Sequence, residues 1–429
     1  MEYEVIELDA SRDWKSGLIR AFANSEHFVC LDSHDAADTY DWLCAGDALA
    51  VFKPENDSLN KLRASRIAHP GWWFGRLNYD LKNELERLSS ENEDRFTWSN
   101  TKFFEAGFVA TSKSGIIELH LHRDSKFDLE SIEEAMESSA EWQRDSNPVH
   151  LISRLDRDVY IDSATSLLKH IQRGDIYEIN YCQEFFSEDV DIAPIEVYNQ
   201  LQKVAKPPMS ALWHAENEWV LSMSPERYLK KVGSRLISQP IKGTARRSKD
   251  SVEDAAIAKA LFHDEKERAE NVMIVDLVRN DLSRVAKRES VEVTELFGIH
   301  SFRTVHQMIS TVEGELRDDL DVWDAIRATF PMGSMTGAPK VRAMQLSESH
   351  ESHKRGIYSG AIGYISPKND FDFNVVIRSV VYDSTSKYLS VSVGSALTSK
   401  ARAEAEWEEC LLKLQAIKDV LSQSHSKED

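Results

Sequence analysis

The chain has 429 residues, of which 41% are hydrophobic, and this is enough to bury a large core in one unit or two domains. Asp and Glu outnumber Lys and Arg by 72 to 52, and the resulting net charge of −20 repels nucleic acid and anionic membranes. The same field repels an anionic metabolite, so a site for such a ligand must supply positive charge through Arg, Lys, a helix N-terminus or a metal ion.

Apolar runs and cysteines indicate the compartment. No apolar run is long enough for a membrane-spanning helix, and the opening MEYEVIELDA lacks the basic and then apolar order of a secretory signal. The cysteines stand far apart, without a CxxC pair or clustered histidines, so we expect neither a zinc site nor a disulfide framework. They are Cys30, Cys44, Cys182 and Cys410. We expect a soluble, cytoplasmic protein with reduced thiols.

The first third of the chain mixes short strand-like runs with helical stretches. We expect strands at 26–33, 47–52, 102–110 and 115–122, and a polar helix at about 128–145. The dipeptide Asn147-Pro148 is a turn signal after that helix. The sequence therefore predicts an N-terminal α+β subdomain at 1–148, a catalytic domain at 149–425 and a polar tail at 426–429.

Beyond residue 149 the alternation is more regular. An amphipathic helix is predicted over 158–173, ending at Gly174. Strands are expected at 176–185, 219–224, 227–232, 235–241, 291–297, 304–316, 358–366, 372–383 and 388–396, and helices at about 251–281, 321–329, 339–349 and 401–422. Short turns such as Val232-Gly233-Ser234 are typical of large antiparallel sheets, and we expect helices packed outside them. The predicted class is α+β.

Two predicted helices each carry a pair of glutamates three residues apart. Glu267 and Glu270 lie in one helix, and Glu406 and Glu409 lie in another. The spacing puts both carboxylates of a pair on one helical face, and two such faces opposite one another offer the oxygen ligands that Mg²⁺ prefers. From the spacing alone, an ordinary solvated acidic face is the better interpretation, because such faces are common.

Three other segments suit an anionic ligand or covalent chemistry. The segment 331–340 (PMGSMTGAPK) places small residues before a helix start whose free N–H groups suit an anion, although a plain glycine-rich loop explains it equally well. Lys242 lies in an apolar strand, where burial would lower its pKa and make the amine a nucleophile. Arg378 follows three apolar residues and suits bidentate carboxylate binding. A solvent-exposed side chain is the alternative for both residues.

Taken in order, six segments resemble the chorismate-utilising enzymes, whose members form anthranilate, aminodeoxychorismate, isochorismate or salicylate. The segments are SPER, QPIKGTARR, KERAENVMIVDLVRNDL, GSMTGAPKVRAM, SGAIGYIS and VVIRS, all within 150–425. The first third of the chain matches only loosely. The resemblance implies two large antiparallel β-sheets packed face to face, with helices outside and an active site in a cleft between the halves.

The resemblance also implies roles for individual residues. It implies Mg²⁺ as the cofactor, bound directly by Glu270 and Glu409 and supported by Glu267 and Glu406. The residues expected to contact the substrate are Tyr364, Arg378, Lys413, Thr336, Gly337, Ala338, Gly394, Gly243, Thr244 and His306. Mg²⁺ between protein and substrate carboxylates would also offset the negative charge of the chain.

Residue 242 indicates which reaction of the family to expect. Members that form anthranilate carry Ala between Pro-Ile and Gly-Thr, whereas members with Lys there are similar to those that form 4-amino-4-deoxychorismate. The resemblance implies that the Lys242 amine attacks C2 of chorismate, that the C4 hydroxyl leaves with a proton from Glu226, and that ammonia adds at C4 before Lys242 departs. Glu226 would need a raised pKa to hold that proton near neutral pH. Such a transferase would serve p-aminobenzoate and folate synthesis.

Other outcomes within the family are distinguished by single positions. Anthranilate formation is the alternative reaction, and Lys242 argues against it. Isochorismate- and salicylate-forming members place a base Lys after the Gly-Asp turn, where Glu178 stands in this chain. A non-catalytic relative is expected to have lost Lys242, Glu226 or the paired glutamates, and all are present.

The chain departs from the family at one strand end, and it shows no sequence signal for a glutaminase that would supply ammonia. Gly394-Ser395-Ala396 replaces the glycine-rich strand end of the family, and its two added Cβ atoms are expected to narrow the approach to the substrate. No cysteine lies in a glycine-rich nucleophile turn, so we expect ammonia from a separate glutamine amidotransferase subunit. A separate pyridoxal-phosphate lyase would release p-aminobenzoate. We expect no nucleic-acid or membrane partner.

Overall fold

The strands form one continuous network in the computed structural model, which describes residues 2–34, 36, 39–139 and 148–423. Across these residues the pairings between the named strands are antiparallel. The network bends into two arms that share the long strand β5 (Thr101–Lys113), which pairs with both β3 and β4.

The first arm runs from β5 to β8. In hydrogen-bonding order its strands are β3 (Trp42–Phe52), β2 (His27–Asp32), β9 (Met209–Ala215), β10 (Glu218–Ser224), β19 (Ser379–Asp383), β20 (Tyr388–Thr398) and β8 (Glu178–Ser187). The short strands β7 (Ile152–Ser153) and β16 (Gly337–Ala338) pair with β8 beyond β20. On the other side of the network, β6 (Ile116–His122) and β1 (Tyr3–Leu8) continue from β5.

The second arm runs from β5 to β14. Its strands in order are β4 (Trp73–Leu77), β17 (Ala361–Ile365), β18 (Phe371–Asn374), β11 (Arg227–Val232), β12 (Arg235–Gln239) and β15 (Val305–Glu315). Two more strands pair with β15, namely β13 (Ile241–Arg246) and β14 (Glu292–Ser301).

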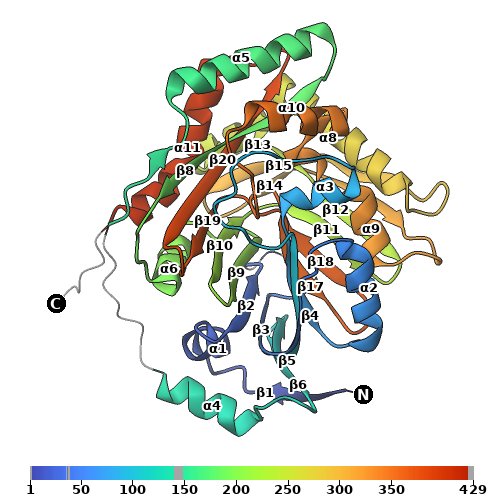
Figure 1. Ribbon diagram of the computed structural model, residues 1–429, viewed down its shortest axis with the longest axis vertical. Coiled ribbons are helices and arrows are strands. Elements are labelled where there is room, and N and C mark those ends of the chain that lie inside the picture. Colours follow the sequence, from blue (N-terminus) through green and yellow to red (C-terminus); the bar gives the residue numbers. More distant parts are fainter. Residues whose placement is uncertain (1, 35, 37–38, 140–147, 424–429) are drawn as a thin grey trace.

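Helices lie outside the strands on both sides of the molecule (Figure 1). Between the arms lies a core that includes Val29, Phe74, Phe104 and Trp213. The helices that pack against the first arm are α1 (Trp14–Phe22), α4 (Leu129–Ser138), α5 (Arg157–Arg173), α6 (Pro194–Val204), α10 (Lys340–His350) and α11 (Ala403–Leu421). Those that pack against the second arm are α2 (Ser58–Ala68), α7 (Ser251–Phe262), α8 (Glu265–Ser283) and α9 (Val322–Thr329).

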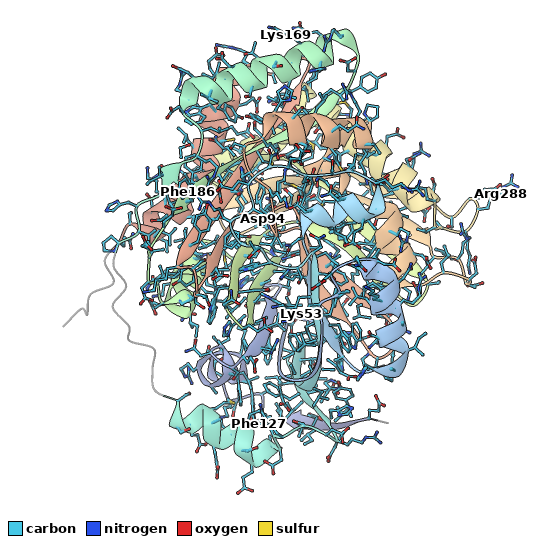
Figure 2. All side chains as sticks on the ribbon, viewed as in Figure 1. Lys53, Asp94, Phe127, Lys169, Phe186 and Arg288 are labelled. Carbon is cyan, nitrogen blue, oxygen red and sulfur yellow. The ribbon has the colours of Figure 1, made fainter. Side chains whose placement is uncertain are left out.

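Three short helical pieces complete the described elements, and they are α3 (Lys82–Leu85), η1 (Tyr79–Leu81) and η2 (Gly333–Met335). Side chains fill the space between strands and helices, while Lys169 on α5 and Arg288 after α8 lie at the periphery (Figure 2). The architecture confirms the predicted α+β class with helices outside, and the two expected sheets are arms of one network. No helix within the described ranges combines the length and the apolar character needed to cross a membrane.

Most predicted elements have counterparts in the structure. The helices predicted at 158–173, 321–329, 339–349 and 401–422 are α5, α9, α10 and α11. The patterns do not predict β1, β4 and β9. Because β4 and β9 are buried on both faces, they lack the alternation of polar and apolar residues that marks a half-buried strand.

The helix predicted at 251–281 is two helices, α7 and α8. Asp264 begins the second one, because its carboxylate accepts hydrogen bonds from the backbone N–H groups of Lys266 and Glu267. The prediction of one continuous helix was therefore wrong. In the second helix Glu270 is buried and Glu267 is half-buried.

The strand predicted at 372–383 is interrupted between β18 and β19. Arg378 lies in the gap with a φ of 53°, in the left-handed region that non-glycine residues seldom adopt. Arg378 is thus not a strand residue, as was predicted, but part of a buried bend.

The predicted division at 148–149 stays a prediction. Strands from both sides of it pair with one another, because β2 pairs with β9 and β4 pairs with β17. The polar helix predicted at about 128–145 begins as α4 and ends at Ser138. Residues 140–147 and the predicted tail at 426–429 lie outside the described residues.

Candidate active site

The site lies where the last strands of the two arms approach each other. Lys242 on β13 donates a hydrogen bond from Nζ to Oε1 of Glu178 on β8, across 2.6 Å. The Lys242 side chain is 10% exposed and that of Glu178 is 1% exposed, so the ion pair is buried. The lysine of the QPIKGT segment therefore points into the interior rather than into solvent.

The protonation of Lys242 differs from the expectation. Burial alone would lower the pKa of its amine, but the charges of Glu178 and Glu270 and the hydrogen bond to Glu178 outweigh burial and raise that pKa. The expected lowering was wrong for this state of the site, because the sequence did not show that Glu178 would contact the amine. Lys242 is an ammonium ion here.

The structure brings the two glutamate pairs together. Lys266 lies between the two pairs, because its Nζ is 3.8 Å from Oε1 of Glu270 on α8 and 3.7 Å from Oε1 of Glu406 on α11. The charges of Glu409 and Glu267 also act on Lys266. The two helical faces thus form one acidic cluster, with the ammonium group of Lys266 between them.

This acidic cluster fits a divalent cation. Its donors are carboxylate oxygens, the ligands that Mg²⁺ prefers. Glu270 Oε1 is buried without a hydrogen-bond partner, and burial raises the pKa of Glu270 to about 7. Within the described ranges no three potential ligands lie close enough to hold an ion as they stand. Lys266 lies between the glutamates. The carboxylates therefore supply the donor atoms of a metal site, but they are not arranged around a metal position in this structure.

Glu226 lies close to Lys242, immediately before β11. It is 5% exposed. Burial raises the pKa of Glu226 to about 7, although the Ser334 hydroxyl and the charge of Lys242 offset part of this effect. A carboxyl with that pKa carries a proton for part of the time near neutral pH, which is the property that the sequence argument required of an acid at this position.

Arg378 and Lys413 supply positive charge to the site. The side chain of Arg378 is half-buried; desolvation lowers the pKa of its guanidinium, and Tyr358 and Glu409 are the groups whose charges act on it. Among the residues that the structure describes, none forms a hydrogen bond or ion pair with this guanidinium, so it is available to an anion. Lys413 Nζ donates to the carbonyl of Gly394 across 2.8 Å and lies 2.7 Å from Oε1 of Glu409.

The loop of Thr336, Gly337 and Ala338 is fixed to β8 beside Glu178. The N–H of Asn180 donates to the Thr336 carbonyl across 2.9 Å, and Gly337 and Ala338 form β16 against β8. Gly337 has a φ of 150°, and a Cβ atom there would lie 2.2 Å from the carbonyl oxygen of Glu178. Only glycine allows this close approach.

The other glycine positions differ in their surroundings. A Cβ atom at Gly243 would lie 3.2 Å from Glu267 Oε2, so this backbone lies against the acidic cluster, whereas Thr244 is exposed. The hydroxyl of Ser395 lies 3.0 Å from that of Tyr160 on α5, and it also bonds Glu406 of the acidic cluster. The expected narrowing of the approach to the substrate by Ser395 and Ala396 stays a prediction.

The structure does not bring Tyr364 to this site. Tyr364 packs against Tyr40 and Trp72 in the core between the arms and lines a small cavity there. Its expected contact with substrate is therefore wrong, because side chains alternate along β17 and this one points to the opposite face. Tyr358, in the preceding turn, is the tyrosine that acts on Arg378.

His306 lies on β15 opposite Ala245 of β13. Its Nε2 lies 3.0 Å from Oδ1 of Asp254 on α7, and its Nδ1 lies 2.8 Å from the hydroxyl of Ser301. These contacts join α7 to β14 and β15, and the expected position of His306 beside the substrate stays a prediction.

Sequence reasoning missed three residues of the site, namely Glu178 as the partner of Lys242, Lys266 and Tyr358. Lys266 stands four residues before Glu270, and that spacing alone placed it on the acidic face. The two tyrosines of RGIYSGAIGY lie six residues apart, so only the start of β17 tells which one faces the site.

Comparisons with known proteins agree with this geometry. Residues 9–419 match the family described as chorismate binding enzyme. The chain is 35% identical over 359 residues to aminodeoxychorismate synthase component 1 of Escherichia coli (strain K12), covering 81% of this chain and 76% of that protein. It is 43% identical over 270 residues to aminodeoxychorismate synthase of Streptomyces griseus, covering 62% of this chain and 36% of that protein.

The relatives differ in length and in reaction. The chain spans between 31% and 57% of the first three curated relatives that it matches. It is 33% identical to anthranilate synthase alpha subunit 1 of Oryza sativa subsp. indica, covering 64% of this chain and 50% of that protein.

Solved structures share the fold. Anthranilate synthase component I from Streptococcus pneumoniae superposes with a TM-score of 0.75 at 25% identity, covering 92% of both chains. The menaquinone-specific isochorismate synthase of Escherichia coli superposes with a TM-score of 0.78 at 15% identity over 98% of this chain and 94% of that one.

Proposed function

Because this chain belongs to the chorismate binding enzyme family, we propose that it is component I of an aminodeoxychorismate synthase. Such a transferase converts chorismate and ammonia to 4-amino-4-deoxychorismate. The observation that carries the proposal is the position of Lys242, a buried amine beside Glu226 and the acidic cluster. Relatives at 35% to 43% identity that are named for this activity support it.

The charged groups of the site suit a dicarboxylate substrate. Mg²⁺ would be held by Glu270 and Glu409, with Glu267 and Glu406 supporting them, and when bound it would neutralise a substrate carboxylate as a Lewis acid. Arg378 offers its guanidinium to a carboxylate. These cations overcome the repulsion from a chain of net charge −20.

The proposed chemistry balances within the named groups. The neutral Lys242 amine forms a bond to C2 of chorismate, the ring double bonds shift, and the C4–O bond breaks. Glu226 protonates the departing hydroxyl, which leaves as water. Ammonia then forms a bond to C4, the double bonds shift back, and the bond between C2 and Lys242 breaks. The nitrogen at C4 then carries one proton more than the neutral amine, and loss of this proton restores the acid form of Glu226.

We propose that the ammonia comes from a glutamine amidotransferase subunit. The name component 1, borne by relatives from Escherichia coli and Bacillus subtilis, implies a second component in those proteins. The four cysteines are free, buried thiols, which supports a cytoplasmic setting. A purified chain that turned over fully with glutamine as its only nitrogen source would contradict this part of the proposal.

The decisive experiment identifies the product. The chain is incubated with chorismate, Mg²⁺ and ammonium, and the products are separated with and without an added aminodeoxychorismate lyase. We expect p-aminobenzoate only when the lyase is present. Fluorescent anthranilate without the lyase would instead establish the second candidate function, which the rice relative at 33% identity favours and Lys242 disfavours.

Replacing the nucleophile tests the covalent step. Lys242→Ala should lower the rate of 4-amino-4-deoxychorismate formation by roughly a hundredfold or more, because the amine that attacks C2 is gone. Lys231→Ala, which removes a lysine of β11 that bonds the carbonyl of Asn369, is the matched control and should keep the activity. A Lys242→Ala enzyme with an unchanged rate contradicts the covalent role.

A further inference from the structure

Glu178 is held rigidly against the amine of Lys242. Its backbone in β8 pairs with Thr398 of β20 on one side and with Ala338 of β16 on the other. Oε1 accepts the hydrogen bond from Lys242, while Oε2 is buried without a hydrogen-bond partner. Oε1 is therefore hydrogen-bonded to the Lys242 amine, whereas Oε2 has no hydrogen-bond donor and can carry a proton.

The charges around this ion pair come from several elements. Lys242 faces Glu178 of β8, Glu226 before β11 and Glu270 of α8, and its charge also reaches Glu267 and Glu409. Glu178 in turn acts on Glu270. Another ammonium, that of Lys266, lies between Glu270 and Glu406.

These surroundings create a problem for the proposed reaction. Carboxylates on three sides keep Lys242 protonated, and an ammonium nitrogen has no lone pair with which to attack carbon. The proton must therefore leave Nζ before or during the attack on C2. Glu178 Oε1, 2.6 Å away, is the acceptor in hydrogen-bond contact with that nitrogen.

We propose that Glu178 is the positioning residue that takes the proton from Lys242 when the amine attacks and returns it when the amine departs. An N–H bond of Lys242 breaks and an O–H bond on Glu178 forms, so the freed electron pair makes the bond to C2. After C4 has been aminated, Lys242 leaves as the neutral amine and recovers the proton. This inference rests on the proposed function and adds to it the group that activates the nucleophile.

Proton transfer from Lys242 to Glu178 can be recognised from the pH dependence of the rate. The pair of Glu178 and Lys242 holds one proton both before and after the transfer, so this step adds no dependence on pH. In Glu178→Gln the amide cannot take the proton, which must then be lost to solvent. The fraction of neutral amine, and with it the rate, should rise about tenfold per pH unit below the pKa of Lys242.

The test compares turnover of the full chain with chorismate, Mg²⁺ and a constant concentration of free ammonia, from about pH 6.5 to about pH 8.5. We expect kcat of Glu178→Gln to be at least roughly a hundredfold below wild type at the lower end, and the ratio of the two to rise with pH. Taking the ratio removes pH effects that both proteins share. The KM for chorismate should change less than about threefold, because the role assigned to Glu178 is proton transfer with Lys242 and not binding of chorismate.

Glu178→Asp is the conservative variant. It keeps a carboxylate one methylene shorter, so it should recover part of kcat and its ratio to wild type should not change with pH. A merely structural role for Glu178 would give both variants the same profile. A Glu178→Gln enzyme with the wild-type profile and rate would overturn the proposal.

A second experiment tests the pairing of Glu178 with Lys242 without measuring turnover. Without substrate or metal, the reaction of Lys242 with a small acylating reagent is followed by peptide mass spectrometry as a function of pH. Labelling of Lys242 should begin at lower pH in Glu178→Gln, because the carboxylate that holds its proton is gone. Unchanged labelling would overturn the pairing. If wild type makes no aminodeoxychorismate, the proposed function fails; if wild type does and Glu178→Gln keeps its profile, only the role of Glu178 fails.

Discussion

Two side chains of the site must exchange protons in opposite directions for the proposed reaction. Lys242 has to lose a proton, although its carboxylate neighbours raise its pKa, and Glu226 has to hold one, although free glutamic acids ionise well below neutral pH. Burial explains the second case directly, since it raises the pKa of Glu226 to about 7. The first case needs a partner, and Glu178 is that partner in the structure.

Activity should therefore depend on the protonated form of Glu226. Because the pKa of this group is about 7, kcat/KM measured at constant free ammonia should fall as the pH rises above that value. Glu226→Gln should lose on the order of 10² to 10⁴ in kcat and should lack this decline. If Glu226→Gln keeps its activity, or if its kcat/KM falls with pH as that of the wild type does, Glu226 is not the acid.

At the scale of elements, the site depends on helices and loops that meet from distant parts of the sequence. Asp264 ends the continuity of α7 and α8 and begins the helix that carries Glu267 and Glu270. The second glutamate pair comes from α11, more than a hundred residues later. The acidic cluster exists because α8 packs on the strands β13 to β15 of the second arm and α11 packs on β20 of the first arm, where the two arms approach each other.

The pairing of α8 with α11 predicts a metal-linked effect of Glu270. Glu270→Gln should weaken Mg²⁺ binding roughly tenfold or more and should weaken chorismate binding with it, because one charged ligand is lost. Calorimetric titration with Mg²⁺ alone and then with chorismate measures both. Glu265→Gln, exposed at the start of the same helix, is the matched control. Unchanged affinity for both ligands in Glu270→Gln contradicts the assignment.

The pairing of β16 with β8 predicts an effect of Gly337. Gly337→Ala would place a Cβ atom 2.2 Å from the Glu178 carbonyl oxygen, so we expect a loss of about 2 to 4 kcal/mol in the free energy of unfolding and a loss of turnover. Gly115→Ala is the control, because Gly115 also has a positive φ but no atom within 4 Å of its Cβ position. It should cost about 1 kcal/mol and leave turnover unchanged. Equal effects of both variants in urea unfolding contradict the predicted clash.

At the scale of the whole molecule, a buried ion cluster ties the two arms together. Arg76 of β4 donates through Nε and Nη2 to the two carboxylate oxygens of Glu218 on β10, each across 2.8 Å. Lys102 of the shared strand β5 lies 2.8 Å from Glu218 Oε1. All three side chains are at most 5% exposed. This cluster joins the first arm, the second arm and the strand between them.

Breaking this cluster should destabilise the fold. Arg76→Ala should lower the free energy of unfolding by about 3 to 5 kcal/mol, because it leaves the Glu218 carboxylate buried with one partner fewer. Lys53→Ala removes an exposed partner of Glu216 and should cost about 1 kcal/mol at most. Urea unfolding measures both, and an equal cost for the two variants contradicts the prediction.

The same cluster sets a direction for acid sensitivity. Burial alone would raise the pKa of Glu218, but Arg76 and Lys102 outweigh burial and lower it below its ordinary 4.5. A lowered folded-state pKa gives stability that is present above that ordinary value and is lost as the pH falls through the folded-state pKa. Arg76→Ala should therefore lose less stability on acidification than wild type.

How far the sequence predicts this protein can be judged from particular residues. The glutamate pairs, the helix-start loop and Lys242 follow from local spacing and from the resemblance of six segments, and the structure brings them together. Tyr364 was misplaced, because one residue of register decides which face of a strand a side chain occupies. The strand predicted across Val375–Arg378 was interrupted, because an apolar run does not show where the backbone bends.

The sequence by itself determined the α+β class, the helices that carry the carboxylates and the presence of a lysine in the QPIKGT segment, since these depend on periodicity and residue type along a short stretch of chain. Only the tertiary structure decided that Glu178, 64 residues away, would pair with the amine of that lysine. It also decided that Arg378 would lie half-buried without a hydrogen-bond partner among the described residues, and that burial would raise the pKa of Glu226 to about 7. These properties arise from burial and from charges contributed by distant strands, and no local pattern encodes them.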